Sequence, residues 1–253
     1  MKKSSQNMYG KLCSQYYDIR KKYASNLEID LYTRFMLPHQ RVLEAMSGSG
    51  RLQIPLLKRG YIVDGVDSSP IMLERCKNRC LEFNLNPKLY EQQLENMELP
   101  YTYQTIIIAI GSFQLIPDKT LALIALKKMH DHLYENGDLL IDIFIPDSFS
   151  SGKQATFIEY IDNHQAIQCD ALYTFYQKEQ KVDVFCTYSL IVSGTIQKRE
   201  KEVMHFIWYS DTEFTELLHS AGFNRLETYE LTLPVTGLSR IVHAKKINTI
   251  SKL

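Results

Sequence analysis

The segment Val42-Leu43-Glu44-Ala45-Met46-Ser47-Gly48-Ser49-Gly50-Arg51 joins a strand-like apolar run to a turn that contains two glycines. An acidic residue, Glu44, lies near the end of the run, and a helix-like stretch follows Gly50. Glycine allows the backbone to approach a ligand closely because it has no Cβ. Many turns between a strand and a helix need glycine only for their geometry, so this segment alone predicts a strand, a turn and a helix.

The next strand-like run ends in Gly65-Val66-Asp67-Ser68-Ser69-Pro70. A carboxylate at the tip of a second parallel strand is placed to accept hydrogen bonds from ribose hydroxyls. Asp67 follows Gly50 at close to the ~20-residue spacing that this role has in nucleotide-binding folds. Ser69 is a good N-cap and Pro70 suits the first helical position, so a helix is expected to begin there. The two segments together predict a nucleoside site at the ends of neighbouring strands.

The stretch from residue 41 to residue 146 alternates strand-like and helix-like runs, the pattern that builds a parallel sheet. Residues 151–209 instead interleave aromatic and β-branched residues with polar ones, which predicts antiparallel strands. A capping box at Ser210 and Glu213 begins one more helix. The expected strands are 41–45, 61–67, 88–92, 105–110, 138–145, 171–177, 182–191, 202–208, 225–231 and 239–245, and the expected helices are 52–58, 70–83, 119–133 and 210–222.

The bulk composition is that of an ordinary globular protein. The chain has 253 residues, with 29 Lys and Arg against 29 Asp and Glu, so its formal net charge is zero and nucleic acid is not an expected partner. The longest aliphatic run, Ile106–Ile110, is too short to cross a bilayer, and no signal peptide is expected. Five scattered cysteines without a Cys-x-x-Cys pair fit a reducing compartment and indicate no metal site. We therefore expect a cytoplasmic protein.

The two quoted segments resemble the first two motifs of class I S-adenosylmethionine-dependent methyltransferases. These motifs are Asp/Glu-x-Gly-x-Gly-x-Gly and a strand ending in Asp followed by Ser-x-x-Met. Ile106–Leu115 is similar to the family's fourth strand and its substrate-facing loop, and Leu133–Leu139 is similar to its turn into the fifth strand. The resemblance extends over residues 9–246 and is strongest over 42–146.

The resemblance implies an α/β fold of Rossmann-like type. We expect a mostly parallel seven-stranded sheet with helices on both faces, plus an antiparallel β insertion in the C-terminal half. A single methyltransferase domain would contain an N-terminal helical cap (1–40), a cofactor-binding core (41–146), a substrate flap (151–209), and a final helix and strands (210–246). The implied cofactor is S-adenosyl-L-methionine.

Three positions depart from the family pattern. Met46 occupies the first glycine, where it either fits beside the methionine moiety of the cofactor or forces a different turn. Gln93 replaces the acidic residue that usually reaches the adenine amino group, although its amide oxygen can still accept from an exocyclic amine. Asp138 replaces the second glycine before the fifth strand. These departures leave a second hypothesis open, a non-catalytic S-adenosylmethionine-binding or regulatory protein.

Other functions fit the sequence less well. A nicotinamide enzyme would need a third glycine at position 53, which is Gln53. The Asn-Pro-Pro-Tyr loop of amide and adenine N-methylating relatives is replaced by Ile110-Gly111-Ser112-Phe113, and no Pro-Cys nucleophile is present. The sequence therefore favours N- or O-methylation of a small molecule, with the catalytic residues and the oligomeric state left unassigned.

The resemblance also implies which residues form the site. Tyr17 and Arg20 precede the first strand, where related enzymes place helices over the cofactor. The expected cofactor-binding residues are Tyr17, Arg20, Glu44, Ala45, Met46, Gly48, Gly50, Asp67, Ser68, Met72, Gln93, Leu94 and Ile110. The candidate substrate-binding residues are Phe113, Tyr173, Tyr188, His205 and Trp208.

Overall fold

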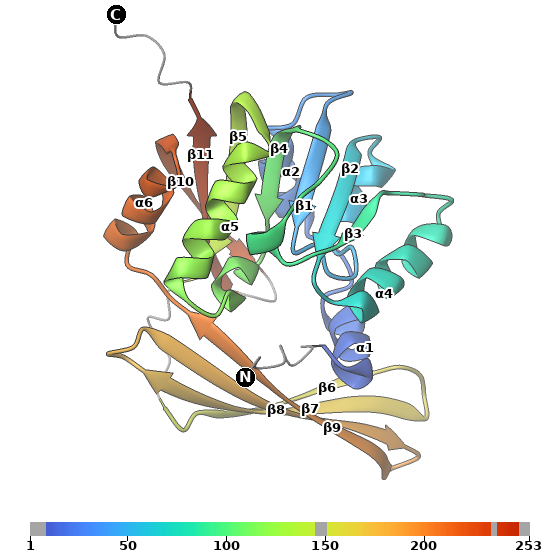
Figure 1. Cartoon of the computed structure of the whole chain (residues 1–253). Coiled ribbons are helices and arrows are strands. Elements are labelled where there is room, and N and C mark those ends of the chain that lie inside the picture. The colour runs from blue at the N-terminus through green and yellow to red at the C-terminus, as the bar shows by residue number, and fades with distance from the viewer. Residues whose placement is uncertain (1–8, 145–150, 234–236, 248–253) are drawn as a thin grey trace, which may run out of the picture. The chain divides into compact units, whose positions relative to one another are not determined.

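The computed structural model describes residues 9–144, 151–233 and 237–247. The chain forms two compact units (Figure 1). The larger unit contains residues 23–145 and 207–253, and the smaller unit contains residues 1–22 and 146–206. The smaller unit is thus built from an N-terminal segment and a long insertion into the larger unit.

The larger unit contains a seven-stranded sheet in the order β10-β11-β5-β4-β1-β2-β3. The pairs from β3 through β2, β1 and β4 to β5 are parallel, whereas β11 pairs antiparallel with both β5 and β10. This sheet confirms the predicted Rossmann-like fold class. Its strands are β1 (Arg41–Ala45), β2 (Ile62–Asp67), β3 (Leu89–Glu91), β4 (Tyr103–Ile108), β5 (Leu133–Ile143), β10 (Phe223–Leu233) and β11 (Gly237–Lys246).

Helices cover both faces of this sheet because its central strands are apolar on both sides. Ile107 of β4 belongs to the cluster that packs α2 and α3, and its neighbour Ile106 belongs to the opposite cluster, which packs α5 and α6. Helix α4 packs beside α3 through Ile54, Cys76 and Cys80. The helices are α2 (Asn26–Thr33), α3 (Gln53–Lys58), α4 (Pro70–Leu81), α5 (Lys119–Asp131) and α6 (Asp211–Ser220), with 3₁₀ turns η1 (Leu94–Asn96) and η2 (Ser112–Leu115).

Side-chain caps begin α4 and α6 where the sequence predicts them. The Ser69 hydroxyl accepts the Met72 N–H at the start of α4, with Pro70 in the first turn. Ser210 and Glu213 form the expected capping box of α6. The parallel strands therefore end at one edge of the sheet with the following helices beginning at fixed points, and ligands bind at that edge in such folds.

The smaller unit contains a four-stranded antiparallel sheet in the order β6-β7-β8-β9, together with helix α1 (Lys11–Arg20). Tyr16 of α1 packs on Tyr188 of β8, and Arg20 lies over the ring of Phe157 of β6. We call the side of the sheet that carries these residues the α1 face. The strands are β6 (Gln154–Tyr160), β7 (Gln165–Tyr176), β8 (Lys181–Val192) and β9 (Thr195–Ile207).

The structure differs from the sequence prediction mainly at element ends. Strands β4 and β5 begin earlier than expected, at Tyr103 and Leu133, and β6 was not anticipated. The expected helical cap over residues 1–40 contains two helices, of which α1 belongs to the smaller unit and α2 to the larger one. Among the described residues, no helix is long and apolar enough to span a membrane.

Candidate cofactor site

The turn after β1 has an unusual backbone. Met46, Gly48 and Gly50 all have positive φ angles, of 57°, 54° and 81°. A Cβ on Gly50 would lie 2.7 Å from Sγ of Cys76, so this glycine is needed for the close approach of α4 as well as for its backbone angle. The turn therefore follows the pattern of a glycine-rich cofactor loop, but with a methionine at its first left-handed position.

Asp67 lies at the carboxyl end of β2, directly beside this turn. Its Oδ2 accepts the Gly48 N–H at 2.8 Å, and its Oδ1 accepts the Ser69 N–H at 2.8 Å. Burial raises the pKa of Asp67, although the backbone N–H groups of Ser69, Gly48 and Ser68 act in the opposite direction. Each carboxylate oxygen can accept a further hydrogen bond. The carboxylate is thus oriented by the two segments that the sequence singled out.

A buried polar cluster lies on the side of the sheet that carries α2. Arg51 donates to both carboxylate oxygens of Glu28 in α2, with its NH1 at 3.0 Å from Oε2. Glu44 of β1 and Asp142 of β5 are also buried, and Oε2 of Glu44 and Oδ1 of Asp142 have no hydrogen-bond partner within the protein. The buried hydroxyl of Tyr32 likewise has none. We call these five residues the carboxylate cluster.

Burial determines the protonation of this cluster. It raises the pKa of Glu44 to about 8 and that of Asp142 to about 7, although the charge of Arg51 lowers both. Burial also acts to raise the pKa of Glu28, but its hydrogen bonds and charge interaction with Arg51 outweigh this effect and the pKa lies below its ordinary value. Glu28 is therefore ionised at neutral pH, whereas Glu44 is largely protonated.

The loop after β4 is attached to the end of β5. Ile110 and Gly111 have φ angles of 48° and 69°. A β-branched residue at positive φ is rare and is strained by ~1–3 kcal/mol, so it needs surrounding contacts to hold it. The Ile110 N–H donates to Oδ2 of Asp142 at 2.9 Å, and the Ser239 hydroxyl donates to the same oxygen at 2.8 Å. Asp142 is thus a site residue that the sequence analysis did not identify.

The comparisons with known proteins agree with this geometry. Residues 42–137 match a family model described as a methyltransferase domain. A structure of an S-adenosylmethionine-dependent methyltransferase from Clostridium acetobutylicum superposes with a TM-score of 0.73 at 18% identity, covering 92% of this chain and 97% of that one. Residues 42–137 therefore match a methyltransferase domain, and the chain has the fold of the class I S-adenosylmethionine-dependent methyltransferases. The cofactor of this methyltransferase is S-adenosylmethionine, as the sequence predicted.

Two further similarities bear on the activity of the methyltransferase. A structure of an amino pentose methyltransferase from Micromonospora echinaspora, bound to S-adenosylmethionine, has a TM-score of 0.72 at 16% identity and covers 95% of this chain and 99% of that one. The carboxy-S-adenosyl-L-methionine synthase of Nautilia profundicola is 27% identical over 205 residues, which are 80% of this chain and 77% of the synthase. At such identities the solved structures show the fold, and the set as a whole supports S-adenosylmethionine-dependent methyltransferase activity.

The residues around the turn fit the cofactor. Glycine at positions 48 and 50 lets the turn pack closely against Met72 and Cys76 of α4, and the Gly48 N–H donates to the Asp67 carboxylate at the carboxyl end of β2. The Ser47 hydroxyl also has no partner within the protein, but it is buried against Gly65 of β2, whose Cβ, if present, would lie 2.7 Å from it. A polar ligand at this edge would find groups with unused hydrogen-bonding capacity. Asp67 would therefore hold the ribose, and the backbone of the glycine turn would lie against the methionine moiety.

The remaining expected cofactor residues of the larger unit occupy varied positions. Ala45 and Leu94 are buried, and Met72 is buried with its Cε 3.2 Å from the point where a Cβ on Gly48 would lie. Met72 thus packs against the turn at Gly48. Gln93 precedes the 3₁₀ turn η1, and its side chain is exposed, as is that of Ser68. Their contacts with the cofactor stay predictions.

Tyr17 and Arg20, the other expected cofactor residues, lie on α1 in the smaller unit. The guanidinium of Arg20 forms an ion pair with Glu159 of β6 at 2.8 Å. The ring of Tyr17 packs edge-on against Tyr9 with centroids 6.1 Å apart. Both side chains therefore already have contacts within their own unit, and a role at the cofactor stays a prediction.

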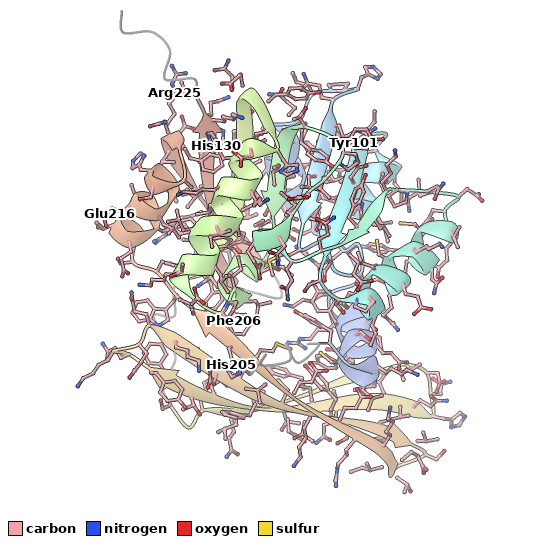
Figure 2. The ribbon with its side chains drawn as sticks, viewed as in Figure 1. Tyr101, His130, His205, Phe206, Glu216 and Arg225 are labelled. Atoms are coloured by element: carbon pink, nitrogen blue, oxygen red, sulfur yellow. The ribbon has the colours of Figure 1, made fainter. Side chains whose placement is uncertain are left out.

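The candidate substrate residues are not all on one surface. Tyr173 and Tyr188 lie on the α1 face, whereas His205 of β9 (labelled in Figure 2) contacts Asp183, whose side chain alternates to the opposite face. Nδ1 of His205 lies 2.7 Å from Oδ1 of Asp183. The sheet therefore does not bring His205 together with the two tyrosines.

The other two candidate substrate residues belong to the larger unit. Phe113 is fully buried and packs with Tyr209 and Phe214 at centroid distances of 6.2 and 5.7 Å. Its ring is thus part of the core beneath the loop after β4. Trp208 is half-buried and directly follows β9. Their roles at a substrate stay predictions.

Met46 allows a sharp test of the turn. Its side chain is half-buried and packs on the core cluster that contains Ile106. At an ordinary position glycine is less stable than alanine by ~0.5–1 kcal/mol, but at positive φ the order reverses. We expect Met46→Gly to be more stable than Met46→Ala by about 1 kcal/mol in chemical denaturation, and to bind S-adenosylhomocysteine within about tenfold of the wild type. An alanine variant as stable as the glycine variant would contradict the left-handed turn.

Proposed function

We propose that the chain transfers the methyl group of S-adenosylmethionine to a nitrogen or oxygen atom of a small molecule. The observation that carries the proposal is the oriented Asp67 carboxylate beside the glycine turn, within a methyltransferase fold. The activated sulfonium supplies the driving force for transfer. The protein mainly has to align the acceptor with the methyl carbon, and such positioning can be worth ~7–11 kcal/mol.

The extent of the structural similarity supports a small-molecule acceptor. An alignment that covers 95% of the chain extends into the smaller unit, since that unit makes up about a third of the residues. The protein on the other side of that alignment is an amino pentose methyltransferase. We therefore favour an amine of a small polar molecule, such as an amino sugar, over a macromolecular acceptor. An amine acceptor must be deprotonated before it attacks.

The test is transfer of a radiolabelled methyl group from S-adenosylmethionine to a panel of amino sugars, simple amines and hydroxylated compounds, followed by a metabolite extract. We expect a labelled small molecule and an equal amount of S-adenosylhomocysteine. An Asp67→Ala variant provides the background. It is assayed at the S-adenosylmethionine concentration that saturates the wild-type protein. The melting temperature with millimolar S-adenosylhomocysteine is measured alongside and should rise.

The outcomes separate the proposal from two rivals. A raised melting temperature with no labelled product from any acceptor would favour a non-catalytic cofactor-binding protein. The similarity to the carboxy-S-adenosyl-L-methionine synthase suggests the other rival. In that case mass spectrometry would show a cofactor product heavier than S-adenosylmethionine, and no free S-adenosylhomocysteine would accumulate. Either result would overturn methyl transfer to a small molecule.

A further inference from the structure

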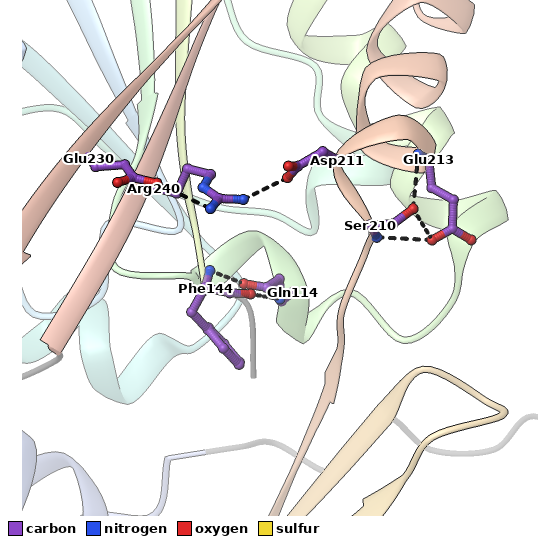
Figure 3. A network of polar contacts seen from close by, with 7 residues as sticks. All are labelled: Gln114, Phe144, Ser210, Asp211, Glu213, Glu230 and Arg240. Carbon is purple, nitrogen blue, oxygen red and sulfur yellow. Dashed lines mark hydrogen bonds and ion pairs between the residues drawn. The ribbon is translucent and has the colours of Figure 1, made fainter. Parts of the chain in front are cut away.

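Gln114 occupies an unusual position for a glutamine. It is fully buried in the 3₁₀ turn η2, within the loop that follows β4. Its Oε1 accepts the Phe144 N–H at 2.7 Å, and its Nε2 donates to the Phe144 carbonyl at 3.0 Å (Figure 3). Nε2 also donates to the Ile207 carbonyl at 3.2 Å. The oxygen and both amide hydrogens are thus engaged with backbone atoms. A buried amide is costly unless it is bonded in this way.

The two backbone segments that Gln114 contacts are connections between the units. Phe144 lies next to the last residue of the larger unit before the insertion, and Ile207 is the first residue of the larger unit after it. One side chain therefore joins the outgoing and the returning chain. The third crossing, at residues 22 and 23, lies elsewhere in the sequence.

The loop that carries Gln114 is held firmly at the cofactor edge of the sheet. Ile110 is fixed in its left-handed conformation by Asp142, and Gly111 approaches the ring of Phe144. A Cβ on Gly111 would lie 2.7 Å from Cδ1 of that ring. A shift of this loop would press Gly111 against Phe144, and it would also move Gln114, which donates to the Ile207 carbonyl.

We propose that Gln114 is a positioning residue that couples occupancy of the cofactor site to both connections of the inserted sheet. A ligand against Ile110 changes the stability of the loop, and the three amide hydrogen bonds carry that change to Phe144 and Ile207. The inference rests on S-adenosylmethionine binding at this edge. It does not require methyl transfer, so its test is independent of the acceptor.

The test is amide hydrogen exchange measured by NMR with and without saturating S-adenosylhomocysteine. In the wild type we expect the ligand to slow exchange at the Phe144 and Trp208 amides by about tenfold or more, together with that of the loop amides. Gln114→Met keeps the side-chain size and removes all three hydrogen bonds. Its dissociation constant for S-adenosylhomocysteine should stay within about threefold of the wild-type value, and the ligand should still slow exchange of the loop amides. The ligand should no longer slow exchange at the Phe144 and Trp208 amides.

Two further variants make the result specific. Gln114→Glu, measured at a pH at which the introduced carboxylate is ionised, keeps the acceptor for the Phe144 N–H and loses both donors to the carbonyls. The ligand should then still protect Phe144 and no longer protect Trp208. Thr105→Val is the matched control, because it removes a buried hydrogen bond of 2.7 Å to the Phe35 carbonyl at the other end of β4. It should respond to the ligand as the wild type does.

The proposal is overturned if the Gln114→Met protein still protects both connections on binding the ligand. It is also overturned if the wild type shows protection of the loop alone, or if Thr105→Val loses the response as completely as Gln114→Met. If Gln114→Met does not fold, the Gln114→Glu protein decides the matter, because equal protection of Phe144 and Trp208 in that variant would exclude transmission through the amide.

Discussion

Replacing Asp67 with alanine is expected to weaken S-adenosylhomocysteine binding by about 100-fold, or ~2.7 kcal/mol. Hydrogen bonds to a charged group contribute ~1.5–3 kcal/mol each, and a ribose offers two hydroxyls to this carboxylate. The same substitution removes the acceptor of the Gly48 N–H, so the turn against the methionine moiety loses its anchor as well. Calorimetric titration of wild type and variant measures the loss directly.

Asp64 offers a matched control on the same strand. Its carboxylate lies three residues before Asp67 and accepts from Arg41 at 2.8 Å and from the Tyr103 hydroxyl at 3.2 Å. Asp64→Asn should lower the free energy of unfolding while leaving the dissociation constant of S-adenosylhomocysteine within about threefold. If Asp67→Ala binds as tightly as Asp64→Asn, the ribose is held elsewhere.

The sequence predicted those parts of the fold that depend on residues close together along the chain. Strand β1 was placed at its observed bounds because a short apolar run precedes a glycine turn, and α4 was placed by its cap and proline. Asp67 was singled out because the role expected of it depends on a spacing along the chain. The seven-stranded sheet followed from the alternation of such units and from the family resemblance.

The rest of the site depends on contacts between distant positions. Asp142 is 32 residues from Ile110, and Gln114 is 93 residues from Ile207. The partners of such side chains are set by strand order and by the return of the chain from the insertion. Both residues did carry one local signal, a polar residue inside an otherwise apolar run, as in Leu139-Leu140-Ile141-Asp142-Ile143. That signal indicates a buried polar group without naming its partner.

The carboxylate cluster makes stability depend on pH. The folded-state pKa values of Glu44 and Asp142, about 8 and about 7, lie above their ordinary values of 4.5 and 3.8. Between pH 4 and pH 8 the folded state therefore binds more protons at these two groups than the unfolded state does. The free energy of unfolding falls as the pH rises through this range. Glu28 acts in the opposite sense, because its pKa is lowered and its contribution is present above pH 4.5.

Arg51→Met is therefore expected to destabilise the protein strongly and in a pH-dependent way. Removing one partner of a buried ion pair leaves an uncompensated charge, which costs ~3–5 kcal/mol. Without Arg51, burial raises the pKa of Glu28 above its ordinary value, so its contribution becomes destabilising above pH 4.5. The loss relative to the wild type should be large at pH 8 and shrink as the pH approaches 4.5. Urea denaturation at several pH values measures it.

Arg59 provides the control, because it joins the end of α3 to α2 through an exposed ion pair with Asp30 at 3.0 Å. Arg59→Met should cost less than about 1 kcal/mol at any of these pH values. Adding Glu28→Gln to Arg51→Met removes the buried charge and should recover part of the loss at pH 8, with little effect at pH 5. Equal losses for Arg51→Met and Arg59→Met at pH 8, or a loss that does not change between pH 5 and pH 8, would show that Glu28 is not a buried charge held by Arg51.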